Sequence, residues 1–200
     1  TERLRSAVQE LSAAFPGDRG LQIQAAGYLL DIGSVDEAAR ILEDVVTRFA
    51  DPGDALTRLA EAELRRGHHA AAYQAALRAV AHDRTDADAR TIRDRAARVL
   101  SIDPSLPRLS AAERTRRIRR LLGEAQDRLA ACDVPPDATP DALALSVERW
   151  LRRPQRDSDV GYALLAAMAR RLRERCPAPP ADDATGLVLI ALTEDNDRGH

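Results

Sequence analysis

The sequence predicts an all-α protein, and three observations lead to this fold class. Aromatic residues make up only 3% of the chain, so the core must consist mainly of Ala, Leu, Val and Ile, and the abundant alanine favours helix. No region shows the apolar–polar alternation that several half-buried strands require. A glycine between two helix-like stretches recurs 34 residues later, at Gly33 and Gly67, and a fixed period of this size indicates stacked helical hairpins.

Two full repeats are expected, each made of two helices joined by a short turn. Glycine ends the first helix because it adopts the left-handed conformation easily. Asp36 and Glu37 suit the positive end of the following helix dipole, and the small Ala38 lets the two helices approach closely. The expected helices are 21–32 and 36–49 in the first repeat, and 54–66 and 69–82 in the second.

A shift of 34 residues also aligns side chains outside the turns. The aligned pairs are Leu30 with Leu64, Ala38 with Ala72, and Val45 with Ala79. Shifted in the other direction, Leu4, Val8, Leu11 and Phe15 fall on Ala38, Leu42, Val45 and Phe49. Residues 1–15 are therefore expected to be the second helix of a repeat whose first helix precedes Thr1 in a longer protein.

A 34-residue helix–turn–helix unit with this pattern of small and large residues resembles the tetratricopeptide repeat. The matching residues are Gly33, Gly67, Ala38, Ala72 and Ala79, together with Pro16 at the family's closing proline. The departures are Gln22 and Leu56 where Trp is common, Ala26 and Ala60 in place of Gly, and Ala50 and Arg84 in place of the closing Pro. The resemblance covers residues 1–101, as a half repeat 1–19, repeats 20–53 and 54–85, and a third first helix at 86–101.

Residues 110–192 are expected to form a helical C-terminal extension without the 34-residue period. Two prolines between Ile102 and Ser110 break the preceding helix, and Ser110 with Glu113 has the pattern of a capping box that starts a helix at 111. The extension either caps the last repeat or forms a small separate bundle, and the short connection at 102–110 favours the cap.

Three further segments complete the extension. A loop is expected at 133–137, followed by a helix that Thr139 caps and that has Pro140 in its first position and Pro154 at its end. Another helix is expected at 158–175. The apolar run 186–192 fits either a short helix or a strand, because periodicity does not decide a run of this length.

The resemblance to tetratricopeptide repeats implies a concave face, lined by first helices, that binds peptides or partner proteins. Arg58, Arg95 and Arg98 could form charge-assisted hydrogen bonds with carboxylates of such a ligand. The family's carboxylate clamp for chaperone tails uses Lys and Asn, which this sequence lacks at these positions, so chaperone docking is disfavoured. The expected partner-binding residues are Ile23, Gly27, Leu30, Thr57, Arg58, Glu61, Leu64, Thr91, Arg95 and Arg98.

The two cysteines each end a predicted helix of the second half. In an up-down-up arrangement, Cys132 and Cys176 would lie at the same end, so a disulfide forms if their Cα atoms approach within about 6 Å. A disulfide would indicate an oxidising compartment, such as the periplasm or the exterior, whereas two free thiols would fit the cytoplasm. The sequence leaves both alternatives open.

Every basic residue in the Lys+Arg count is Arg, a composition typical of a GC-rich genome, and this excludes any chemistry that needs lysine. The densest run, from Arg114 to Arg120, is interpreted as a solvated helix face or as a patch for an acidic partner or nucleic acid. Nucleic acid is disfavoured, because the net charge is −2 and no aromatic residues alternate with the arginines. His68 and His69 are adjacent, which does not suit a metal site.

The sequence contains no catalytic signature, so we expect neither an enzyme nor a cofactor. It also lacks an apolar run long enough to cross a bilayer. The leading hypothesis is a module or scaffold that binds a protein or peptide. Two alternatives remain open: a non-catalytic helper domain of a larger enzyme, and a structural component of an envelope or secretion assembly. The identity of the partner and the oligomeric state are not determined by the sequence.

Overall fold

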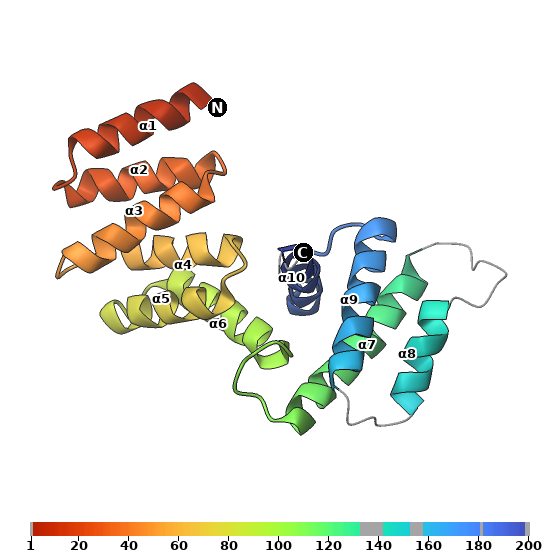
Figure 1. The fold of residues 1–200 in the computed structure, drawn as a ribbon. Helices are drawn as coiled ribbons and strands as arrows, with labels where there is room; N and C mark the ends of the chain where they lie inside the picture. Colours follow the sequence, from red (N-terminus) through yellow and green to blue (C-terminus); the bar gives the residue numbers. More distant parts are fainter. Residues whose placement is uncertain (1, 133–141, 153–157, 181, 199–200) are drawn as a thin grey trace. The chain divides into compact units, whose positions relative to one another are not determined.

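The fold was examined in a computed structural model that describes residues 2–132, 142–152, 158–180 and 182–198, with side chains up to residue 193. These residues form ten helices and no strand, which confirms the all-α prediction. The chain divides into two compact units, Thr1–Ala97 and Arg98–His200 (Figure 1). The expectations for the loop at 133–137, for Thr139 and Pro140, and for Pro154 lie outside the described residues.

The first unit is a series of helical hairpins. Consecutive helices α1 to α5 pack side by side in chain order, and α2 also contacts α4, the corresponding helix of the next repeat (Figure 1). The helix α6 begins in this unit and ends in the second. The helices are α1 (Glu2–Ala14), α2 (Arg19–Asp31), α3 (Val35–Arg48), α4 (Ala55–Arg65), α5 (His69–His82) and α6 (Ala87–Ile102).

The two repeat turns have the same backbone geometry. At the first, Gly33 has φ of 81°, and the N–H of Ser34 donates to the carbonyl of Leu29 at 2.8 Å, which is the Schellman pattern of a helix end. At the second, Gly67 has φ of 76°, and His68 has φ and ψ of −81° and 65°, against −82° and 62° at Ser34. The 34-residue period therefore holds in the backbone as well as in the sequence.

Gln22 joins α1 to α2 at the position where the repeat family commonly has Trp. Its side chain is buried, and its amide nitrogen donates to the carbonyl of Ser12 at 2.7 Å and to that of Phe15 at 2.9 Å. Its amide oxygen accepts from the hydroxyl of Ser12 at 2.6 Å. These bonds satisfy a buried polar side chain and also give the carbonyl of Ser12, near the end of α1, a donor from outside the helix.

One face of α1 is apolar and open to solvent. Leu4, Leu11 and Phe15 are 50%, 48% and 52% exposed, whereas Ala38 and Val45, their counterparts on α3, are fully buried. The difference arises because α2 covers α3, while no described helix covers this face of α1. Such an exposed stripe fits the expectation that α1 is the second helix of a repeat.

The second unit has a hydrophobic core of its own, as an independent bundle requires. Helices α7 and α9 form the main pair, α8 packs mainly on α9, and α10 lies along α9. The run 186–192 is helical and belongs to α10, which resolves the alternative left open by the sequence. A Cβ at Gly161 would overlap the ring of Trp150, so glycine is what lets α8 and α9 approach. The helices are α7 (Ala111–Ala131), α8 (Ala142–Arg152), α9 (Ser158–Arg175) and α10 (Ala184–Arg198).

Replacing the turn glycine should destabilise the first unit through backbone strain alone. A Cβ at Gly33 would meet nothing within 4 Å, so Gly33→Ala is expected to cost about 1–2 kcal/mol for its left-handed backbone. The free energy of unfolding from urea titrations followed by circular dichroism measures this cost. Gly17→Ala is the matched control, because Gly17 also has open space but no positive φ; equal effects of both changes would contradict the explanation.

Candidate functional site

Most of the predicted partner-binding residues lie on α2 and α4, the first helices of the two repeats. Gly27 and Leu30 are buried, so their side chains offer no accessible surface, and Leu30 belongs to the core of the first unit. The half-buried members are Ile23, Thr57, Arg58, Glu61 and Leu64. We call the surface formed by these five side chains the first-helix face.

Arg58 and Gly27 are brought together across two repeats. A Cβ at Gly27 would lie 2.7 Å from Nη1 and 3.4 Å from Cζ of Arg58, so the guanidinium rests directly on the backbone of α2. A Cβ at this position would force the end of the Arg58 side chain to shift, so glycine lets the guanidinium lie here. Among the residues that the structure describes, no hydrogen bond or ion pair occupies the Arg58 side chain. The guanidinium therefore lies against α2 with its donors unused among the described residues.

Two other members of the first-helix face bind within the unit. Arg65 donates to the carbonyl of Leu30 at 2.9 Å and also pairs with Glu61, so Glu61 helps to orient a side chain that caps α2. Thr57 donates to the carboxylate of Asp86 at 2.6 Å. Glu61 thus pairs within α4, whereas Arg65 and Thr57 link α4 to α2 and to the start of α6. Arg58 is left as the charged group of this face without a hydrogen bond or ion pair among the described residues.

The three predicted residues on α6 have different surroundings. Asp86 caps this helix by accepting from the N–H of Ala89 at 2.8 Å. Thr91 is exposed and donates back to the carbonyl of Ala87 at 2.9 Å. Arg95 is half-buried, and its buried Nε has no partner within the described part of the chain. Arg98 is exposed but belongs to the second unit, so the structure does not assign all ten residues to one unit.

Glu63 is a buried charged residue that the sequence reasoning missed. It is 4% exposed at the position that corresponds to the fully buried Leu29 in the preceding repeat. Its carboxylate accepts from Nη1 of Arg66 at 2.6 Å and lies 2.8 Å from Nδ1 of His68. The 34-residue alignment contained a signal for this buried charge. Glu63 stands where the preceding repeat has an apolar residue, and Arg66 and His68 follow it closely in the sequence.

The arginine run on α7 is occupied largely by contacts inside the second unit. Arg117 donates to the carbonyl of Leu100 at 2.9 Å and to that of Asp103 at 2.8 Å, which satisfies the end of α6. Arg119 donates to the carbonyl of Leu151, at the end of α8. Arg114 donates to a loop carbonyl, Arg116 pairs with Glu113, and Arg120 pairs with Glu124. These bonds favour a structural role for the run.

Ser110 starts α7 as predicted, but only one of the two expected capping bonds has its predicted partner. The hydroxyl of Ser110 accepts from the N–H of Glu113 at 3.2 Å. The carboxylate of Glu113 instead accepts from Nε of Arg117 at 2.8 Å, and this hydrogen bond lowers the pKa of Glu113. The acid at this position therefore orients the arginine that satisfies α6.

Cys132 and Cys176 form a disulfide, one of the two states that the sequence left open for these cysteines. Their Cα atoms are 5.5 Å apart, and the bond closes a loop with a sequence separation of 44. It joins the end of α7 to the end of α9, so both helices are covalently fixed at the same end of the bundle.

Arg128 and Asp183 form the second cross-link of this region. The two nitrogens of the guanidinium lie 2.5 Å and 2.8 Å from the two carboxylate oxygens, which is the bidentate geometry of a strong ion pair. Asp183 also accepts from the N–H of Gly186 at 3.1 Å and so caps α10. The hydrogen bonds from Arg128 hold the pKa of Asp183 below its ordinary value, against the opposing effect of burial.

No protein-family model matches the chain, and neither a curated protein nor a solved structure matches it. The resemblance to tetratricopeptide repeats therefore stays a prediction that rests on the repeat itself. Among the described helices, none is both long and apolar enough to span a bilayer.

Removing the charge of Asp183 should weaken the second unit more at neutral pH than in acid. A lowered folded-state pKa contributes stability above the unfolded value of about 3.9, and this contribution is lost as the pH falls through the folded value. Asp183→Asn is expected to cost about 1 kcal/mol at pH 7, a value reduced for partial exposure, with a smaller cost near pH 3. Fluorescence of the single Trp, Trp150, reports unfolding of this unit. The exposed Asp182→Asn is the control; a constant cost at both pH values would contradict the assignment.

Loss of the disulfide should lower the stability of the second unit alone. By the chain-entropy estimate for a loop of this length, replacing both cysteines by Ser costs about 4 kcal/mol. Urea unfolding followed by Trp150 fluorescence measures the loss. Mass spectrometry after alkylation, without reductant, counts free thiols in the unmodified protein. Two free thiols together with an unchanged unfolding midpoint would show that the bond does not form.

Proposed function

We propose that the first unit is an interaction module of the tetratricopeptide type, which binds an acidic segment of a partner protein at the first-helix face. The exact 34-residue period, the matched turns and the contact between α2 and α4 support a stacked-hairpin module. The observation that carries the proposal is the guanidinium of Arg58, seated on the backbone at Gly27 with its donors unoccupied within the described residues.

Arg58 has the properties of a ligand anchor. Because its guanidinium already packs against α2, little side-chain freedom is lost when a carboxylate binds. A guanidinium offers planar, paired donors that match both oxygens of a carboxylate. The half-buried Ile23 and Leu64 provide apolar contact on the same two helices. A segment that combines acidic and aliphatic side chains satisfies both parts of this surface.

Two further functions are proposed as alternatives for the whole protein. The disulfide favours an oxidising compartment, which fits a structural role in an envelope or secretion assembly. A non-catalytic helper domain of a larger enzyme is the other alternative. Nucleic acid is the weaker candidate, because the arginines of the α7 run bind carbonyls and carboxylates of their own unit.

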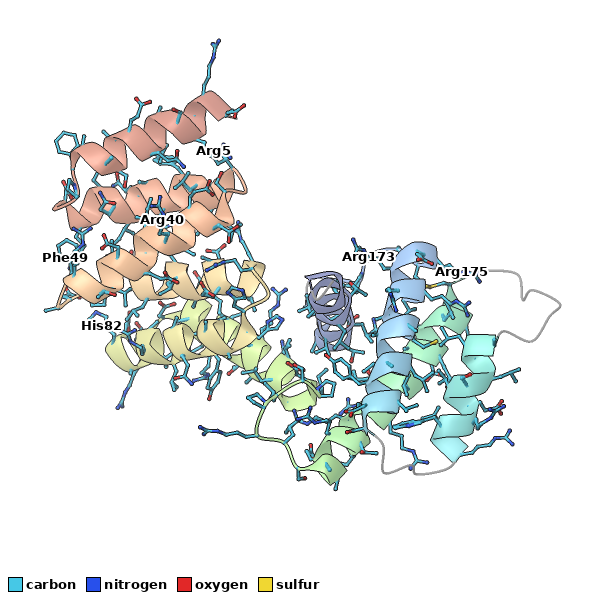
Figure 2. All side chains as sticks on the ribbon, viewed as in Figure 1. Arg5, Arg40, Phe49, His82, Arg173 and Arg175 are labelled. Atoms are coloured by element: carbon cyan, nitrogen blue, oxygen red, sulfur yellow. A yellow bond between two sulfur atoms is a disulfide. The ribbon has the colours of Figure 1, made fainter. Side chains whose placement is uncertain are left out.

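Reversing the charge of Arg58 should abolish binding of acidic peptides. Peptides selected from a random display library against the protein should be enriched in Asp and Glu, and Arg58→Glu should weaken their binding at least about tenfold. Arg40→Glu is the matched control, since Arg40 is exposed on α3, a second helix of the repeat (Figure 2). Fluorescence anisotropy of labelled peptides gives the dissociation constants.

A second variant tests the position of the guanidinium without changing charge. Gly27→Ala places a Cβ against Nη1 of Arg58 and should displace it, so binding should weaken although every charged residue is kept. Circular dichroism confirms folding of each variant. Selected peptides without acidic enrichment, or equal binding by the Arg58→Glu and Arg40→Glu variants, would contradict the proposal.

A further inference from the structure

The second unit contains a cavity at the end of the bundle where the disulfide joins α7 to α9. It has a volume of about 550 Å³ and is bounded by those two helix ends, by α10 and by the segment 177–180. This volume is within the range of small-molecule sites in proteins, about 300–1,000 Å³. Because an apolar cavity of about 150 Å³ holds one benzene molecule, this one has room for a ligand of roughly 10–20 non-hydrogen atoms.

Small residues leave this space open. Ala131 on α7, Ala169 on α9 and Gly186 on α10 all line the cavity and contribute almost no side-chain volume to it. A Cβ at Gly186 would lie 2.4 Å from Cβ of Pro179, so the backbone of α10 already touches the proline-containing segment there. The cavity therefore results from the choice of side chains and not from a gap between the helices.

The walls of the cavity are aliphatic. Leu172 on α9 and Leu189 and Ile190 on α10 supply most of the large side chains. No aromatic side chain is found among the described lining residues, so a flat ring system would have no stacking platform. Ala131 and Pro177 are exposed at the rim, which gives a ligand a way in from solvent.

Three cross-links hold the walls in place. The disulfide fixes the ends of α7 and α9, and both of its cysteines line the cavity. The ion pair between Arg128 and Asp183 joins α7 to the start of α10. The hydroxyl of Thr185 donates to the carboxylate of Glu124 at 2.5 Å, which adds a second bond between the same helices. Because the walls are preformed, little ordering of the protein opposes binding.

The two cationic side chains of the lining both have partners within the protein. Arg128 is paired with Asp183 through both nitrogens of its guanidinium. Arg173, near the end of α9, is exposed, donates to the hydroxyl of Thr193 at 3.4 Å and has a further partner (Figure 2). An anionic ligand would therefore find no unpaired counter-charge here, and a cationic ligand would face two guanidinium groups. Both conditions favour a ligand without charge.

We propose that this cavity binds a neutral aliphatic molecule of medium chain length, such as a primary alcohol. The aliphatic walls remove the chain from water, and burial of apolar surface supplies the affinity without help from the arginines. The site belongs to the second unit and is independent of the peptide-binding function proposed for the first.

Titration calorimetry with 1-octanol, below its solubility limit, tests this proposal on the full chain. We expect one molecule to bind per chain, and 1-hexanol should bind about fifteenfold more weakly, since each buried methylene changes the affinity by a factor of about four. Octanoate and octylammonium should bind no more tightly than octanol. Arg173→Gln should leave the affinity for octanol within about twofold, because a neutral ligand needs no charged anchor.

These titrations separate a neutral ligand from a charged one. Absence of octanol binding, equal affinities for hexanol and octanol, or tighter binding of octanoate or octylammonium than of octanol would each overturn the proposal. A tenfold loss of octanol affinity in Arg173→Gln would overturn it too.

Filling the cavity locates the bound octanol. Ala169→Phe should abolish binding, and Ala131→Trp, at an exposed position on the rim, does the same if the interior variant does not fold. The matched controls are Ala163→Phe on α9 and Ala130→Trp on α7, which are exposed and do not line the cavity, so both should keep the affinity of the unmodified protein. Circular dichroism and a free-thiol count verify the fold and the disulfide of each variant. Octanol binding that survives in the folded cavity variants, or that the control variants lose equally, would overturn the proposal.

Discussion

The left-handed backbone at Gly33 and Gly67 determines how the hairpins of the first unit close. A helix that ends in this conformation turns its chain back within three residues, and the next helix then begins at a fixed point. Ala38, fully buried five residues after Gly33, can contact the preceding helix because the turn is so short. The packing that follows is a consequence of this constraint, since the same side chains would not meet if the turn were longer.

No short sequence pattern of this kind sets the packing of helices in the second unit. Contacts between residues far apart in the chain hold it together instead. The disulfide, the pair of Arg128 with Asp183 and the bonds from Arg117 each connect residues that no short-range pattern relates. Such contacts constrain helices whose connections are long. The first unit gains its order from repetition, whereas the second gains it from cross-links.

This difference explains what could be predicted from the sequence. Helix ends follow from glycine, acidic and capping residues, which act over a few positions. Asp86 caps α6 in this way, and Ser110 caps α7 through one of the two bonds of a capping box. The contact of Arg58 with Gly27 could not be predicted, because it depends on how α4 lies on α2. The disulfide could be considered only as an alternative, since two cysteines in one chain do not establish a distance.

The arginines show most clearly that the sequence does not reveal which side chains meet in the fold. In the sequence, the run from Arg114 to Arg120 is the densest positive segment, and Arg58 is a single charge. In the fold, a guanidinium on α7 finds carbonyls at the ends of α6 and α8, because those helix ends need donors. Arg58 meets a backbone that is already paired within α2, so its own donors remain unused among the described residues. Availability of a charge for a partner therefore depends on which helix end lies nearby, and not on how many charges surround it in the sequence.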